Sequence, residues 1–179
     1  MHSSNKRKYK ASDAVVLHAT LKNVKTIHIK VYELNLVKTS LLGQNRVTDN
    51  EVNLSFLKPS QEEFYQHKFI NSYAVEDVDI PINIPKRMGV FIVDLQGETV
   101  TSRAVIKKGA ILCLESFTEA GQTFSFYDED GRPLTSKEGL KVWNSGTPVN
   151  LKDGNSFETD YKEESDEWIK IVASMGSYA

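Results

Sequence analysis

The stretch GVFIVDLQGETVTSRAVIK, residues 89–107, decides the fold. Two runs rich in β-branched and aromatic residues, 90–95 and 99–106, flank the short polar segment Gln96-Gly97-Glu98. Two such runs joined by a glycine-containing loop of about three residues are typical of a β-hairpin. We therefore predict an antiparallel hairpin from Gly89 to Lys107, with Gly97 in its turn.

Upstream of this hairpin, apolar residues alternate with polar ones, which is the period of a half-buried strand. One strand is predicted from Val15, Leu17, Ala19 and Leu21, and a second from Ile27, Ile29 and Val31. Val78, Ile80 and Ile82 predict a third strand, which contains Pro81. Because proline cannot donate to a sheet ladder, this strand is expected at an edge or a bulge.

The segment 34–72 has a weaker pattern. Val52, Leu54 and Phe56 alternate like a strand, residues 59–63 favour a helical turn with Pro59 early in it, and residues 64–70 favour another strand.

Beyond Lys107, the polar segment Lys107-Lys108-Gly109 is expected to be a flexible edge between two modules. Short strands are then predicted at 122–127, 140–143 and 168–173, separated by turn-forming segments at 128–133, 144–146 and 153–155. For residues 163–175, a helix capped by Gly176 is the alternative.

Four segments resemble, in this order, a known family: residues 25–34, 89–93, 101–109 and 128–134. The set is similar to the tandem macroglobulin-type domains of large alpha-2-macroglobulin-like proteins. The resemblance implies seven-strand, fibronectin-type sandwiches in a longer array, an extracellular, cell-surface or periplasmic location, and a closing strand within residues 169–179. A Cys-Gly-Glu-Gln thioester motif is not found in the sequence, so the resemblance does not carry protease trapping to this chain.

We therefore expect an all-β chain with two modules. A disordered leader at residues 1–10 precedes a fibronectin- or immunoglobulin-like seven-strand β-sandwich at 11–109, and a second, smaller macroglobulin-like β module occupies 110–179. With about 70 residues, the second module has room for only a marginal core.

The charge balance gives no overall attraction to nucleic acid or to an anionic membrane, because 22 basic residues face 24 acidic ones and the net charge is −2. The basic run Lys6-Arg7-Lys8 with Lys10 is interpreted as a solvated tail. Met1-His2-Ser3-Ser4 resembles the remains of an expression leader. We expect neither a nucleic-acid partner nor membrane insertion.

The residues that could carry chemistry do not form a recognisable site, and we predict no catalytic, metal-binding or cofactor-binding residue. Cys113 is the only cysteine, so it forms no intrachain disulfide. The apolar run at residues 110–114 is typical of a strand interior and predicts a buried, inert thiol. His18, His28 and His67 lack metal-ligand spacing and are interpreted as surface residues. The glycines Gly43, Gly89 and Gly97 are too scattered to cradle a phosphate.

Asp128-Glu129-Asp130-Gly131 resembles the beginning of a calcium loop, but Gly139 stands where the twelfth-position carboxylate is needed, so a tight hairpin turn is predicted. Residues 158–167 are acidic and are interpreted as a solvated loop. Trp143 and Trp168 could offer platforms to a ligand, although large aromatic residues in short strands usually anchor the core.

The sequence predicts a non-catalytic structural or interaction module, part of a larger protein and monomeric in isolation, whose partners are neighbouring domains or another protein. The alternative is a module that binds carbohydrate or peptide through exposed aromatics such as Trp143 or Tyr65. An enzyme that uses the segment 34–72 is a third hypothesis, because functional loops occur on such scaffolds.

Overall fold

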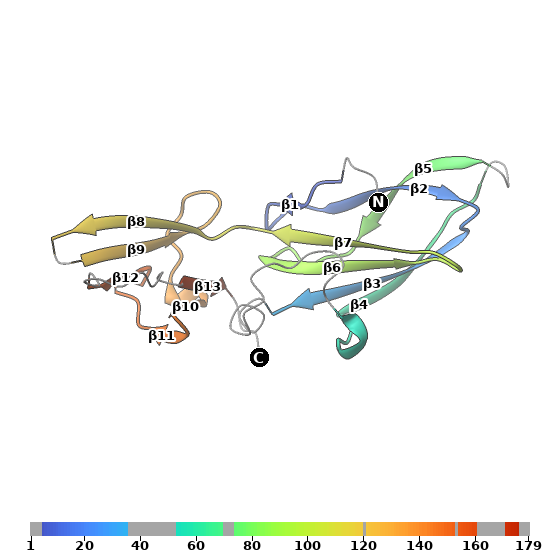
Figure 1. Cartoon of the computed structure of the whole chain (residues 1–179). Coiled ribbons are helices and arrows are strands. Elements are labelled where there is room, and N and C mark those ends of the chain that lie inside the picture. The colour runs from blue at the N-terminus through green and yellow to red at the C-terminus, as the bar shows by residue number, and fades with distance from the viewer. Residues whose placement is uncertain are drawn as a thin grey trace. The chain divides into compact units, whose positions relative to one another are not determined.

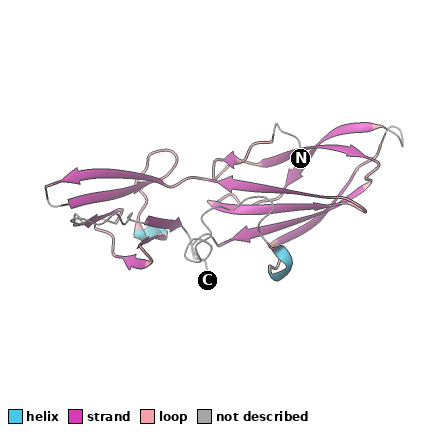
Figure 2. Ribbon diagram, viewed as in Figure 1, coloured by secondary structure: helices cyan, strands magenta, loops and turns pink. Residues whose placement is uncertain are grey.

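The computed structural model describes residues 5–35, 53–69, 74–119, 121–152, 154–160 and 171–175, and these fall into two compact units. Unit 1 contains the described residues up to Leu34 and from Asn53 to Gly109, and unit 2 contains Asn35 and the described residues from Ala110 onward. Among the described residues, the regular elements are strands and two short 3-10 helices (Figure 2). The predicted all-β fold is therefore confirmed. Neither of these short helices has the length and apolar character needed to cross a membrane.

Unit 1 is a sandwich of two sheets, and Figure 1 shows the two layers. One sheet has the order β1-β7-β6-β3-β4 and the other pairs β2 with β5. In the described part of unit 1 these make seven strands, the number that the family resemblance implied, although β1 was not among the strands predicted from the sequence. Their bounds are β1 Lys8–Tyr9, β2 Val15–Lys22, β3 Thr26–Leu34, β4 Gln61–Gln66, β5 Val75–Ile82, β6 Gly89–Gln96 and β7 Thr101–Lys108.

The predicted hairpin is confirmed. Strands β6 and β7 pair antiparallel along their whole length, with Val93 opposite Ala104. The turn between them contains Gly97, whose N–H donates to the carbonyl oxygen of Val100 at 2.8 Å. The two β-rich runs therefore lie at the centre of the larger sheet.

The core of unit 1 lies between the two sheets, and the alternation predicted for β2, β3 and β5 is confirmed. Its buried side chains come from both layers: Val15, Leu17, Leu21, Ile27, Ile29, Val31, Val78, Ile80, Ile82, Ile84, Phe91, Val93, Leu95, Ala104 and Ile106. Pro81 lies opposite Val16 in β5, which pairs only with β2 among the described strands. This is the edge position that the proline predicted.

A smaller apolar cluster covers the other face of the larger sheet. It contains Tyr32, Leu34, Val90, Ile92 and Val105, and Leu54 of the 3-10 helix η1 (Leu54–Phe56) packs against it. Strand β6 is consequently buried on both of its faces. Strands that are buried on both faces have continuous apolar sequences, and this explains the apolar run at residues 90–93.

Two predictions for the weak middle segment are wrong. Leu54–Phe56 is a 3-10 turn and not a strand, and the Asn53 side chain accepts a hydrogen bond from the Ser55 N–H at 2.9 Å at its start. The helical turn predicted at 59–63 is also wrong, because β4 begins at Gln61 and places Glu62 opposite Lys30 of β3. Pairing with β3 overrides the local preference of a few residues. Residues 36–52 and 70–73 lie outside the described part of the chain.

The prediction of a disordered leader at residues 1–10 is wrong for the last residues of this segment. Lys8 and Tyr9 pair with Lys107 and Lys108 of β7 in parallel. The carbonyl oxygens of Arg7 and Tyr9 accept hydrogen bonds from the N–H groups of Lys107 and Gly109, at 2.9 and 2.8 Å. The basic run is therefore attached to the sandwich edge and is not simply a solvated tail.

Lys107-Lys108-Gly109 is likewise not the flexible edge that its polarity suggested. Lys108 is only 2% exposed, and its Nζ donates a hydrogen bond to the carbonyl oxygen of Asp13 at 2.7 Å. Burial lowers the pKa of the Lys108 ammonium, although the nearby Asp13 carboxylate acts in the opposite direction. The end of β7 is thus a packed part of unit 1.

Unit 2 contains two three-stranded sheets, with the orders β12-β9-β8 and β11-β10-β13. The bounds are β8 Leu112–Thr118, β9 Gly121–Tyr127, β10 Leu140–Asn144, β11 Thr147–Val149, β12 Ser156–Thr159 and β13 Ile171–Met175, with the 3-10 helix η2 at Ser136–Glu138. The predicted strands at 122–127 and 140–143 are confirmed.

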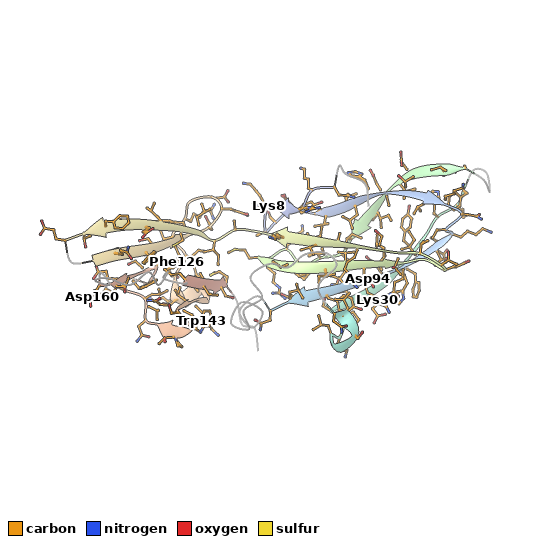
Figure 3. The ribbon with its side chains drawn as sticks, viewed as in Figure 1. Lys8, Lys30, Asp94, Phe126, Trp143 and Asp160 are labelled. Carbon is orange, nitrogen blue, oxygen red and sulfur yellow. The ribbon has the colours of Figure 1, made fainter. Side chains whose placement is uncertain are left out.

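The described buried side chains of unit 2 include stacked aromatic rings. Phe157 lies 5.2 Å from Phe124 and 6.2 Å from Phe126 between ring centroids, and Phe126 is labelled in Figure 3. Residues 171–175 pair antiparallel with β10, so the helix considered for 163–175 is wrong for these five residues. Residues 161–170, Trp168 among them, lie outside the described part.

Gly121 offers a test of the β9–β12 sheet. Its φ is +147°, and a Cβ at this position would overlap the carbonyl oxygen of Thr159 and lie 3.1 Å from its carbonyl carbon. We expect Gly121→Ala to destabilise the protein by about 2–4 kcal/mol, measured by denaturant unfolding, because strain and overpacking add.

The matched control is Gly131, which also has a positive φ, +80°, but no atom within 4 Å of its would-be Cβ. Gly131→Ala should cost only about 1–2 kcal/mol, from the backbone alone. Equal losses for the two variants would show that the contact with Thr159 does not matter.

The division into modules that fold separately remains a prediction. We expect residues 5–109 to unfold cooperatively on their own, because they contain both sheets of the sandwich and its core, whereas residues 110–179 should be less stable in isolation. Thermal unfolding of each half, followed by circular dichroism, measures this. Two halves that fold only when mixed would mean that the modules share their core.

Candidate interaction surface

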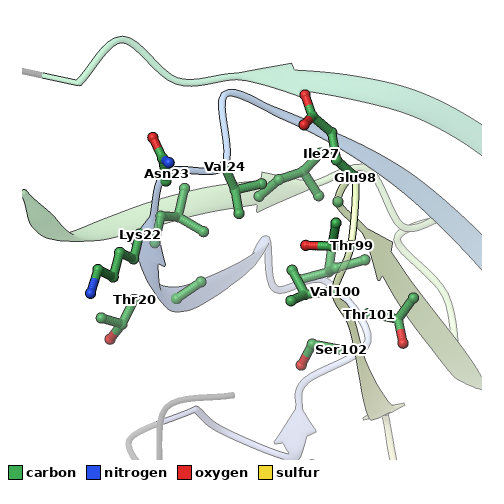
Figure 4. Close-up of a pocket in the computed structure, with 14 residues that line it drawn as sticks. Thr20, Lys22, Asn23, Val24, Ile27, Glu98, Thr99, Val100, Thr101 and Ser102 are labelled. Atoms are coloured by element: carbon green, nitrogen blue, oxygen red, sulfur yellow. The ribbon is translucent and has the colours of Figure 1, made fainter. Parts of the chain in front are cut away.

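Unit 1 has a cleft at the end of the sandwich where the β2–β3 and β6–β7 turns lie. Its volume is about 850 Å³, and Figure 4 shows its lining. Residues from β2 and the following turn form one wall, and residues from the β6–β7 turn and the start of β7 form the other. The lining consists of Ala19, Thr20, Leu21, Lys22, Asn23, Val24, Ile27, Leu95, Gly97, Glu98, Thr99, Val100, Thr101 and Ser102.

The cleft has an apolar interior and a polar rim. Leu21, Ile27 and Leu95 belong to the buried core and reach the cleft from inside. Val100 is 54% exposed and adds apolar surface to the opening of the cleft. The rim carries hydroxyl groups and two opposite charges, Lys22 and Glu98. This composition is typical of a surface that binds a partly apolar ligand.

The cleft is open because two strand edges border it. Among the described strands, β2 pairs only with β5, so its other edge has no ladder partner. On its outer side, β7 pairs with β1 only at Lys107 and Lys108. Thr101 and Ser102 of β7, which line the cleft, lie outside this pairing. The cleft lies beside the parts of β2 and β7 that pair with no described strand on this side.

Next to the cleft, the N-terminal segment, residues 5–9, contacts the edges of both β2 and β7. The Asn5 side chain bonds the backbone of His18 twice, accepting from its N–H at 2.7 Å and donating to its carbonyl oxygen at 2.8 Å. The Tyr9 hydroxyl donates to the carbonyl oxygen of Val16 at 3.4 Å. Burial, and to a smaller extent the Asp13 carboxylate, raises the pKa of Tyr9, so the hydroxyl remains a donor at neutral pH.

The three described histidines each contact a carboxylate. His18 pairs with Asp79 across β2 and β5, His28 Nε2 lies 2.9 Å from Glu62, and His67 Nε2 lies 2.8 Å from Glu76. All three histidines were expected at the surface, but only His18 is exposed. The His67 side chain, in contrast, is only 15% exposed. Among the described residues, no three His, Cys, Asp or Glu side chains gather as metal ligands would.

The prediction that Cys113 is buried is wrong. Cys113 is exposed in β8, as are the other residues of that strand. In the described structure β8 is the edge strand of its sheet, with only β9 beside it. The apolar run at residues 110–114 therefore predicted the strand correctly, but it did not predict that the side chains of this strand are exposed to solvent.

The thiol of Cys113 should react completely but slowly near neutral pH. Partial desolvation, followed by the Glu115 carboxylate, raises its pKa above the usual 9.0. Because the thiolate is the reactive form, the rate of labelling by iodoacetamide should rise about tenfold per pH unit up to that pKa.

The variant Glu115→Gln should label faster than the wild type at the same pH, since it removes the negative charge. A rate that is independent of pH between 7 and 9 would contradict the raised pKa.

The remaining sequence candidates do not meet at the cleft. The tight turn at residues 128–131 is confirmed, and Asp128 Oδ1 accepts the N–H groups of Asp130 and Arg132 at 2.9 and 2.8 Å. Trp143 and Tyr65 are each partly buried, and Tyr65 packs against the core of unit 1. Gly43 and residues 161–167 of the acidic stretch lie outside the described part.

Sequence analysis missed the cleft-lining residues of the two turns, Val24 and Val100 above all. Val100 was assigned to the hairpin and Val24 to the gap between two strands. In the sequence, the available sign of the cleft was that each of these two aliphatic residues stands next to polar turn residues.

Residues 27–109 match the family described as AbpF first immunoglobulin-like domain. This covers less than half of the chain, and it ends at Gly109, as unit 1 does. Over 177 residues the chain is 24% identical to a protein of Dictyostelium discoideum named Actin-binding protein F. The match covers 97% of this chain, which spans 7% of the length of that relative.

The chain is also similar to two solved structures of Escherichia coli alpha-2-macroglobulin, at 11% identity. One spans the domains MG0-NIE-MG1, with a TM-score of 0.49 over 93% of this chain and 61% of the other. The second spans NIE-MG1, with a TM-score of 0.48 over 94% of this chain and 93% of the other. Both structures are of an alpha-2-macroglobulin, the kind of protein whose domains the sequence resembles.

Proposed function

We propose that this chain is a non-catalytic, immunoglobulin-like module of a larger multidomain protein, and that it binds another protein at the cleft of unit 1. The observation that carries the proposal is the cleft itself, an apolar interior beside the edge of β2 that pairs with no described strand. Protein recognition commonly uses such edges, because backbone groups give affinity and neighbouring pockets give specificity.

The chemistry of the lining supports binding over catalysis. Its ionisable side chains are Lys22 and Glu98, and the other polar side chains are hydroxyls and the Asn23 amide. Acid–base or nucleophilic catalysis needs a base held within hydrogen-bond reach of its partner. The three His–carboxylate pairs of unit 1 do not line the cleft.

The proposal of a larger protein is supported by the relative, of which this chain matches a small part. The immunoglobulin-like match in unit 1 is consistent with one domain of an array. Peptide binding is favoured over carbohydrate binding, because Trp143 and Tyr65 do not line the cleft.

The test is selection of peptides from a displayed library on the immobilised full chain. We expect selected peptides to lose at least about tenfold in affinity for Val100→Lys, which places a cation in the cleft. The matched control is Leu114→Lys, because Leu114 is similarly exposed, at 59%, belongs to unit 2 and does not line the cleft. Peptides that bind the two variants equally well would place binding elsewhere.

Actin is a second candidate partner, favoured by the relative's name and by the similarity along almost the whole chain. Co-sedimentation with actin filaments tests it. If actin binds at the cleft, the wild type and Leu114→Lys should pellet with filaments and Val100→Lys should remain in solution. A wild-type chain that stays in solution would remove this candidate without affecting the binding of peptides.

A further inference from the structure

We propose that the N-terminal segment and the end of β7 form a mechanical clamp, through which unit 1 resists tension applied along the chain. Tension of this kind reaches a module through the backbone at its two ends, as it does in any array of modules. The inference goes beyond the proposed function, because it concerns a load that unit 1 carries and does not depend on binding at the cleft.

The clamp depends on the parallel direction of β1 and β7. Lys8 pairs with Lys107 and Tyr9 with Lys108, and the arrows of the two strands point the same way in Figure 1. The chain enters β1 at Lys8 and leaves β7 at Lys108, and in a parallel pair these are opposite ends. A pull on both sides therefore slides the two strands past each other along their length.

Sliding loads the hydrogen bonds between the two strands together. The Lys107 N–H donates to the carbonyl oxygen of Arg7 at 2.9 Å, and the Gly109 N–H donates to that of Tyr9 at 2.8 Å. Because both bonds cross between the sliding strands, they share the load and must break at the same time. In an antiparallel pair the same pull would act at one end of the ladder and open its bonds one after another.

A buried ammonium group holds the clamp beyond β1. Lys108, only 2% exposed, donates from Nζ to the carbonyl oxygen of Asp13 at 2.7 Å. The turn that carries this carbonyl is closed, since the Asp13 N–H donates to the carbonyl oxygen of Lys10 at 3.1 Å and the Lys10 N–H donates to Asp13 Oδ2 at 3.0 Å. Sliding would remove this hydrogen bond from a buried charge, which is costly, so the contact resists the pull as well.

The N-terminal segment is also held on its other side, by the second sheet. The Asn5 side chain makes two hydrogen bonds with the backbone of His18, at 2.7 and 2.8 Å, and the Tyr9 hydroxyl donates to the carbonyl oxygen of Val16 at 3.4 Å. The segment thus joins β2 of one sheet to β7 of the other. Tension from the N-terminal side is therefore shared between both sheets before it reaches the core.

The clamp ends where unit 1 ends. Gly109 makes the last backbone bond of the clamp and is the last residue of unit 1, while Ala110 belongs to unit 2. The φ of Gly109 is +70°, and a Cβ there would overlap the Met88 side chain, so this position requires glycine. Force that arrives through the backbone from Ala110 meets the bond of Gly109 first.

The test stretches single molecules of the full chain between the N-terminus and Cys113 in optical tweezers. Cys113 is exposed and is the only cysteine, so it accepts a handle shortly beyond unit 1 without any substitution. Unit 1 of the wild type should unfold in one step. Lys107→Pro should raise the unfolding rate at constant force at least about fivefold, because proline lacks the N–H that bonds Arg7.

The matched control is Ser60→Pro. The Ser60 N–H donates to the carbonyl oxygen of Val31 at 2.7 Å, beside β4 at the opposite edge of the same sheet. Both proline variants should lose stability in denaturant. Under constant force, however, Ser60→Pro should stay within about twofold of the wild-type unfolding rate, because this edge does not join the two loaded ends.

Lys108→Met is an independent second variant, useful if Lys107→Pro does not fold. Methionine fills similar space but cannot donate to Asp13, so the unfolding rate at constant force should rise at least about fivefold even if stability in denaturant is kept. Equal rates under force for Lys107→Pro and Ser60→Pro, or a wild-type rate for Lys108→Met, would overturn the proposal. So would a wild type whose N-terminal segment detaches in a separate step before the core unfolds.

Discussion

Burial of β6 on both faces is the constraint on which unit 1 depends. Phe91, Val93 and Leu95 enter the core between the sheets, while Val90 and Ile92 enter the cluster beneath η1. The one acidic side chain of this strand, Asp94, is 7% exposed, and Gln96 Nε2 donates to it at 2.7 Å while Arg103 Nε lies at 3.5 Å. A buried carboxylate needs such partners, because its desolvation is otherwise costly. The positions of β3 and β7 follow from pairing with this strand.

The central strands could be predicted from the sequence because their signal is local. Residues 89–107 combine β-rich runs with a glycine turn, and residues 15–31 alternate in polarity, so propensity, period and burial agree there. The prediction failed where pairing with a distant strand decides the structure. Gln61 is strand because β3 lies beside it, and Lys8 is strand because β7 does. No pattern within a few residues carries that information.

Exposure was harder to predict than secondary structure, and Cys113 shows the reason. The run Ile111-Leu112-Cys113-Leu114 correctly indicated a strand, but burial depends on what covers the strand. In the described structure β9 is the only neighbour of β8, so Leu114 and Phe117 are 59% and 66% exposed. The cleft was missed for a similar reason. Its walls come from turns about 75 residues apart, and only the fold brings Val24 and Val100 into one site.

The two edges of the β2–β5 sheet differ in a way that bears on binding. Free edges invite pairing with other chains, and proteins protect them with proline and with charged side chains. β5 carries both, since Pro81 lacks the N–H that a ladder needs and Asp77 and Asp79 are exposed. β2 has no proline, and the N-terminal segment contacts its backbone through Asn5 at His18 and Tyr9 at Val16. One strand of this sheet therefore carries the protection of its edge in its own sequence, whereas the other receives it from a segment that also pairs with β7.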